Sequence, residues 1–163
     1  MASVLSHAVA ALGIGSCFYR HRVPKSVWVV GAICSMIPDL DVVGFRLGVR
    51  YGDFWGHRGM THSLVFAGLI TGAITLIWFR YGATGITRLA LSAYLFLATA
   101  SHGILDAFTN GGLGVAFFSP FNRDRYFFPW RPILVSPDSS AGRDISCSRM
   151  KWSGYGSRRR FSP

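Results

Sequence analysis

The chain of 163 residues is apolar and basic: half of its residues are hydrophobic, only 15% are charged, and the net charge is +10. Soluble domains usually carry about 25% charged residues, and all seven acidic residues here are Asp, so the composition argues against an ordinary water-soluble helical domain. A basic charge also suits a nucleic-acid surface, but only where the charges lie on solvated faces.

Four apolar runs, separated by charged residues, predict helices that cross a membrane. In chain order they are residues 2–19, 26–38, 59–79 and 89–105. A spanning helix needs roughly 17–25 residues, which the third run meets fully and the first and fourth meet marginally. The second run reaches this length only if it extends through Asp39 and Asp41 to Phe45. The alternative, a soluble helical core, requires a polar helix face that the third run lacks.

The C-terminal part of the chain differs in composition from these runs. Residues 117–132 are aromatic and basic, which is typical of the membrane–water interface. Residues 136–163 are rich in Ser, Gly and Arg and have no apolar period, so we expect a disordered or aberrant basic tail. The predicted fold class is therefore an all-α membrane protein with about four transmembrane helices in residues 1–135, followed by this tail.

Polar side chains in and beside the apolar runs are the candidates for a functional site. A charged Asp at the centre of a membrane helix costs about 2.5–3.5 kcal/mol, so such residues usually have a function. His102 and Asp106 are four residues apart, so their side chains share one face of a helix. Asp39 and Asp41 follow Pro38, which ends or bends the helix, and on an extended turn both would face the same side. The full set is His7, Asp39, Asp41, His57, His62, His102 and Asp106.

Helix direction is expected to bring this set together. Because four consecutive spans alternate in direction, all seven residues are predicted at the same face of the membrane. Imidazole and carboxylate ligands suit Zn, Mn or Fe(II). Seven ligands exceed the three or four of one catalytic zinc ion, which predicts two metal ions with a bridging carboxylate. Histidines that only hydrogen-bond to neighbours, or a His pair that ligates haem, are the alternatives.

The stretches around these residues resemble the YdjM-like membrane-bound metal-dependent hydrolases, a bacterial inner-membrane family linked to LexA-regulated genes. The matching stretches, in order, are SHAVAALGIG (6–15), PDLD (38–41), HRGMTHS (57–63), SHGILDAFTNGG (101–112) and FSPFNRDRYFFPWRPI (118–133). The resemblance covers roughly residues 3–137 and implies a small multi-pass inner-membrane protein with a divalent-metal hydrolase site on the same seven residues. After Pro137 the chain departs from the pattern of the family. The family pattern leads us to expect a further helix there, and we expect this chain to lack it.

These observations together predict an integral-membrane metal-dependent hydrolase that uses two divalent ions, Zn or Mn, to cleave a phosphoester or other ester at the membrane face. A water between the two ions, with its pKa lowered toward neutrality, is the expected nucleophile. Thr61 and Asn110 are expected to orient ligands. The expected catalytic residues are Asp39, His57 and Asp106, and the expected substrate-binding residues are Arg58, Arg123, Arg125 and Arg131.

The expected partners are the lipid bilayer and a lipid-linked phosphate substrate, and no nucleic-acid partner is expected. The alternative function is that of a non-catalytic, metal-binding structural membrane protein with the same ligands. A metal carrier is disfavoured, because ions must also leave at the far side of the membrane. The opposite helix ends carry basic residues and no second cluster of ligands.

Overall fold

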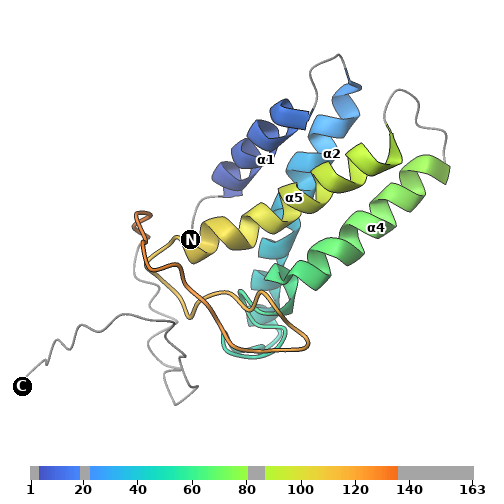
Figure 1. Ribbon diagram of the computed structural model, residues 1–163. Coiled ribbons are helices and arrows are strands. Elements are labelled where there is room, and N and C mark those ends of the chain that lie inside the picture. The colour runs from blue at the N-terminus through green and yellow to red at the C-terminus, as the bar shows by residue number, and fades with distance from the viewer. Residues whose placement is uncertain (1–3, 19–22, 81–86, 136–163) are drawn as a thin grey trace, which may run out of the picture.

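The computed structural model describes residues 4–18, 23–80 and 87–135. These residues form helices that run back and forth, with the long loops gathered at one end (Figure 1). The elements are α1 (Val4–Phe18), α2 (Lys25–Met36), η1 (Ile37–Val42), α3 (Val43–Arg46), η2 (Met60–His62), α4 (Leu64–Arg80) and α5 (Arg88–Ala107), where η denotes a 3₁₀ helix. Within these ranges there is no β-strand, only isolated bridges between loop residues, so the all-helical prediction is confirmed.

Two helical segments are long and apolar enough to cross a membrane: Lys25–Arg46 and Arg88–Ala107. The segment Lys25–Arg46 combines α2, η1 and α3. The second apolar run of the sequence therefore continues past Asp39 and Asp41, as it must do to be long enough to cross a membrane. The α-helix itself ends at Met36, and the 3₁₀ helix contains Pro38 at its start, which agrees with the expected effect of this proline. Leu5–Phe18 and Leu64–Trp78 are shorter apolar helices.

The third apolar run is not helical over its whole length, because α4 begins at Leu64 and not at residue 59. The hydroxyl oxygen of Ser63 accepts a hydrogen bond from the backbone N–H of Phe66 at 3.1 Å, which caps the first turn. The residues before Ser63 form η2 and a loop. His57 and His62 therefore lie before the helix, at its entrance.

Helix α5 is central to the packing and contacts α1, α2 and α4. The buried core between α1, α2 and α5 contains small side chains next to the large ring of Tyr94. Gly31 of α2 lies against this ring, so closely that a Cβ at this position would collide with the Tyr94 hydroxyl. Small residues at helix contacts allow such close approach in membrane proteins.

We expect Gly31→Ala to destabilise the fold, because its methyl group would also lie 2.6 Å from Cε1 of Tyr94 in a packed core. Overpacking of this kind costs about 1–3 kcal/mol. Gly72→Ala is the matched control, since a Cβ there meets nothing within 4 Å and alanine favours the helix by about 0.5–1 kcal/mol. Thermal unfolding in detergent, followed by circular dichroism, should show a lower midpoint for the Gly31 variant alone. Equal midpoints would contradict this packing.

The long loops lie at the end of the bundle where α1 and α4 begin and α5 ends (Figure 1). Residues 47–63 and 108–135 meet there through backbone hydrogen bonds, including Leu64 N–H to Phe117 O at 3.0 Å and Ala116 N–H to Arg58 O at 3.0 Å. This arrangement brings residues from distant parts of the sequence to one end of the helices. The tail predicted for residues 136–163 lies outside the described residues.

Candidate metal centre

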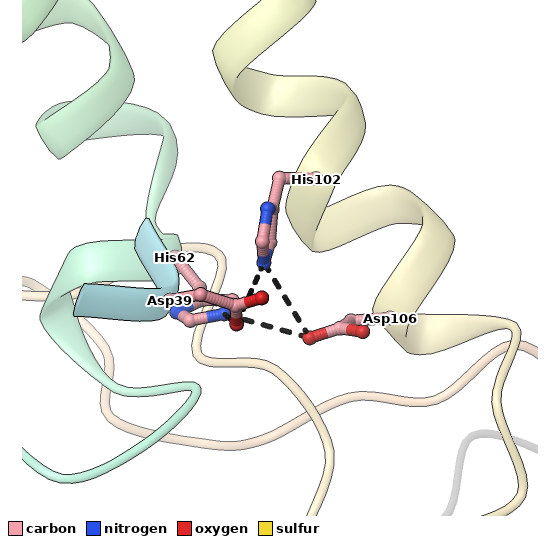
Figure 2. Close-up of side chains that lie close together, drawn as sticks. All are labelled: Asp39, His62, His102 and Asp106. Carbon is pink, nitrogen blue, oxygen red and sulfur yellow. Dashed lines mark hydrogen bonds and ion pairs between the residues drawn. The ribbon is translucent and has the colours of Figure 1, made fainter. Parts of the chain in front are cut away.

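Four buried side chains from three segments converge at this end of the bundle: Asp39, His62, His102 and Asp106 (Figure 2). One ligand atom of each lies within 4.8 Å of the others, and we call this set the first group. Nε2 of His102 lies 3.2 Å from Oδ1 of Asp39 and 3.8 Å from Oδ2 of Asp106. Nε2 of His62 lies 3.5 Å from the same Asp106 oxygen and 3.8 Å from the same Asp39 oxygen.

Both histidines of the first group are held at the nitrogen that points away from it. Nδ1 of His102 donates a hydrogen bond to the carbonyl oxygen of Ser35 at 2.6 Å, which leaves Nε2 as the acceptor. Nδ1 of His62 lies 3.1 Å from the Thr61 hydroxyl and 3.3 Å from Oδ2 of Asp41. Outer partners of this kind fix the tautomer and orientation of metal-binding histidines.

Asp41, His57 and His62 form the second group, which shares His62 with the first. Oδ1 of Asp41 lies 2.7 Å from Nδ1 of His57, and its Oδ2 accepts a hydrogen bond from the Thr61 hydroxyl at 2.6 Å. Asp41 therefore orients two histidines. The expectation that Asp39 and Asp41 face the same side of an extended turn is wrong, because both lie in the 3₁₀ helix η1, where residues two apart diverge.

His7 reaches the same place from α1 but belongs to neither group. Its ring stacks on that of His102, with centroids 3.7 Å apart and planes 14° apart. Nε2 of His7 lies 3.9 Å from Oδ1 of Asp106, and the side chain is fully buried. Each of the seven residues predicted to share one membrane face thus lies close to at least one other of the set, at one end of the helices.

Buried polar atoms without a hydrogen-bond partner are concentrated here, which tests whether the residues fit a metal ion. Such atoms are rare in folded proteins, and each calls for a partner. Within the described part of the chain they include His7 Nδ1 and Nε2, Asp39 Oδ2, His57 Nε2, His62 Nε2 and Asp106 Oδ1. Imidazole nitrogens and carboxylate oxygens are the donors that suit Zn, Mn or Fe(II). The residues therefore fit a divalent metal ion.

Four arginines were predicted to bind substrate, and the fold gives them different environments. Nε of Arg58 lies 3.1 Å from Oδ2 of Asp106, and its Nη1 donates to Gly111 O at 2.6 Å, so Arg58 is buried at the first group. The guanidinium of Arg125 donates instead to backbone carbonyl oxygens of His57, Tyr51, Asp53 and Gly114, which ties two loops together.

Arg123 and Arg131 lie away from the first group and each stacks on an aromatic ring. The guanidinium carbon of Arg123 is 5.0 Å from the Phe54 ring centroid, and that of Arg131 is 4.9 Å from the Phe127 ring centroid. Asn110 accepts a hydrogen bond from Val135 N–H at 2.9 Å and contributes to neither group, whereas Thr61 orients Asp41 and His62 as expected.

Sequence reasoning missed the backbone carbonyls that hold the site, those of Ser35 and Gly111. Every residue carries a carbonyl oxygen, so no residue type signals this role. Gly112 carried a weak signal as part of a Gly-Gly pair. It has a φ of 80°, and a Cβ there would collide with the Tyr51 hydroxyl and lie 2.9 Å from Nη1 of Arg58.

We expect metal binding to depend on pH through His62, which precedes α4. Burial by itself lowers the pKa of His62, but the close carboxylates of Asp106, Asp39 and Asp41 outweigh burial and raise it to about 10. Metal-free His62 is therefore protonated below this pH, whereas a metal ion binds the neutral imidazole. Binding of Zn²⁺ or Mn²⁺ should release one proton, and the apparent Kd should fall about tenfold per pH unit between about pH 6 and 9. Calorimetric titration across this range measures both, and a pH-independent Kd would contradict the protonated state.

Comparison with known proteins identifies the family. The family described as "YdjM inner membrane protein" matches residues 1–155. The chain belongs to this family. The resemblance predicted from the five stretches is confirmed, and it extends beyond Pro137, where we expected it to end. The family supports an inner-membrane location for this YdjM-family protein.

Two relatives of this YdjM-family protein are similar over most or much of their length. "Inner membrane protein YbcI" of Escherichia coli (strain K12) is 36% identical over 158 residues, which cover 93% of this chain and 90% of the relative. "Uncharacterized protein YvsG" of Bacillus subtilis (strain 168) is 33% identical over 116 residues, which cover 64% of this chain and 68% of the relative. No solved structure matches.

Proposed function

We propose that this YdjM-family protein is an integral-membrane metal-dependent hydrolase that cleaves a phosphoester or other ester at the membrane face. The observation that carries the proposal is the first group, in which two imidazoles and two carboxylates present ligand atoms within 4.8 Å of one another. Both imidazoles are oriented by outer hydrogen-bond partners, as in metal sites of known proteins. A divalent ion held there would supply Lewis acidity and would lower the pKa of water.

Charge balance supports one resident divalent ion in the first group. The buried ion pairs join the carboxylates of Asp39, Asp41 and Asp106 with one guanidinium, that of Arg58. With neutral imidazoles this set has two excess negative charges, which one Zn²⁺ or Mn²⁺ neutralises. Buried charges are stable only when they are compensated. The number of ligands predicted two ions. A second ion in the second group would require His62 to bind metal through both of its nitrogens. The metal content per chain therefore decides between one ion and two.

The proposed roles of the residues around the ion follow from their contacts and, for His57, from a nitrogen that has no hydrogen-bond partner. Asp41 accepts the Nδ1 proton of His57, and Nε2 of His57 has no hydrogen-bond partner. This nitrogen is therefore placed to take a proton from an attacking water and return it to the leaving group. Asp39 and Asp106 hold the ion, and Arg58 positions Asp106 while its charge offsets negative charge that develops on the substrate.

The proposal includes four membrane spans, formed by α1, the segment Lys25–Arg46, α4 and α5. In this arrangement the end of the bundle that carries the site, where α1 and α4 begin (Figure 1), would lie at one membrane face, beside the lipid headgroups. A lipid-linked phosphate is the substrate that such a position favours. The lipid bilayer is the proposed partner. The exposed apolar side chains of α1, α2 and α4, such as Leu69 and Leu76, suit contact with its acyl chains.

A non-catalytic metal-binding membrane protein is the second candidate, and burial favours it. His7 and His102 are fully buried and Asp106 is 1% exposed. Catalytic metal sites keep an open coordination position, whereas structural sites are closed. The second candidate therefore predicts tight metal retention without turnover.

Metal-loaded protein in lipid nanodiscs, assayed on lipid phosphomonoesters, phosphodiesters and carboxylic esters, separates the two candidates. Wild type should turn over at least one of these classes, and His57→Gln should reduce kcat about 10²–10⁴-fold while metal content is retained. Asp124→Asn is the control, because Asp124 belongs to neither metal-ligand group and is not among the lining residues of the pocket described below. Bound metal with no turnover on any ester would refute the hydrolase and support the structural protein.

A further inference from the structure

A pocket of about 240 Å³ lies outside the metal centre, between two loops of the same end of the molecule. Residues 52–59 form one side, with Gly52, Phe54 and Gly59, and residues 116–125 form the other, with Ser119, Arg123 and Arg125. None of these residues belongs to either metal-ligand group. Gly59 directly follows Arg58 and lies three residues before His62 of the first group.

The lining of the pocket contains two arginines, Arg123 and Arg125, and one acidic residue, Asp53. Asp53 is its acidic lining residue, and it is held by Arg50 through an ion pair of 3.8 Å and a backbone hydrogen bond of 2.9 Å. Among the ion pairs of residues 4–18, 23–80 and 87–135, none involves Arg123. Its guanidinium is instead pre-oriented by the ring of Phe54. A planar, pre-oriented guanidinium suits the oxygens of a phosphate.

Exposed aromatic side chains flank the lining residues along the chain. Trp55 is 58% exposed and follows Phe54, while Phe118 and Phe121, 51% and 88% exposed, flank Ser119 and its neighbouring proline. Exposed aromatics beside arginines are characteristic of the membrane–water interface, where lipid phosphates lie. In an inner-membrane protein, such a surface suits the level of the lipid headgroups, where anionic lipids are concentrated.

We propose that this pocket binds the phosphate of an anionic glycerophospholipid. Arg123 is the principal contact, the fixed Arg125 forms the wall of the pocket, and the three exposed aromatics border the acyl chains. This inference does not rest on the hydrolase proposal, because it needs neither the metal ion nor turnover.

Arg123→Gln and Arg131→Gln form a matched pair for testing the pocket. Each removes one positive charge from the same loop and one guanidinium stacked on a phenylalanine, but only Arg123 lines the pocket. Detergent-purified protein is titrated with phosphatidylglycerol, phosphatidylcholine or inorganic phosphate, and bound lipid is counted by native mass spectrometry. Wild type should bind phosphatidylglycerol in preference to the other two. Arg123→Gln should weaken this binding at least tenfold, and Arg131→Gln should leave it within about twofold.

Three outcomes would overturn the proposal: equal loss in both variants, equal binding of phosphatidylcholine, or saturation by inorganic phosphate alone. Metal content of each variant reports whether the fold and the first group are intact. If Arg123→Gln fails to fold, Arg123→Lys replaces it, because it keeps the charge and loses the two-pronged contact. The lysine variant should bind phosphatidylglycerol more weakly than wild type, and unchanged binding would contradict the role of the guanidinium.

Discussion

Asp106→Ala is expected to abolish retention of metal by the purified protein. Oδ2 of Asp106 faces both His62 and His102 of the first group, so the substitution removes one of four ligands. Binding of a structural metal ion is worth about 10–16 kcal/mol in small domains, and a quarter of this corresponds to an affinity loss of about 10²–10³-fold. The variant also leaves the buried guanidinium of Arg58 without its carboxylate.

Inductively coupled plasma mass spectrometry of wild type, Asp106→Ala and Asp53→Ala measures this effect directly. Asp53 is also an aspartate of the loop end, but its side chain is 44% exposed and pairs with Arg50, so Asp53→Ala should keep the wild-type metal content. Asp106→Asn preserves the shape of the side chain and separates ligand loss from misfolding, which circular dichroism monitors. Wild-type metal content in Asp106→Asn, or no Zn, Mn or Fe in wild type, would refute the metal centre.

Gly112→Ala is expected to disturb the metal site by displacing Arg58 and to destabilise the fold. Gly112 has a φ of 80°, which costs a residue with a side chain about 1–2 kcal/mol. The added Cβ would also collide with the Tyr51 hydroxyl and lie 2.9 Å from Nη1 of Arg58. Because Arg58 pairs with Asp106, its displacement should weaken metal binding about 10–100-fold, as loss of an outer partner does elsewhere.

Gly48→Ala provides the matched control for this effect. Gly48 has a φ of 84°, but a Cβ there meets nothing within 4 Å, so its substitution costs only the backbone strain. Both variants should lower the midpoint of thermal unfolding, and only Gly112→Ala should lower metal affinity. An equal change in metal affinity for both variants would show that Arg58 does not depend on the space at Gly112.

The main geometry of the site was predictable because it depends on helix period and helix direction. His102 and Asp106 are one turn apart on α5, so they face the same group, 3.8 Å apart. Alternating helices then brought His7, Asp39 and His62 to the same end, as the apolar runs predicted. The helical fold followed from the same runs, although α4 begins five residues later than the run because Ser63 caps it.

The sequence by itself therefore determined which residue types meet and at which end of the helices, because apolar period and chain direction are local properties. Only the tertiary structure decided which atom of each residue pairs with which partner. It shows Asp41 as the partner of His57 and Thr61, the carbonyl of Ser35 as the partner of His102, and Arg125 as a clamp on backbone carbonyls. These roles depend on hydrogen bonds between segments far apart in the chain, which no local pattern of residue types specifies.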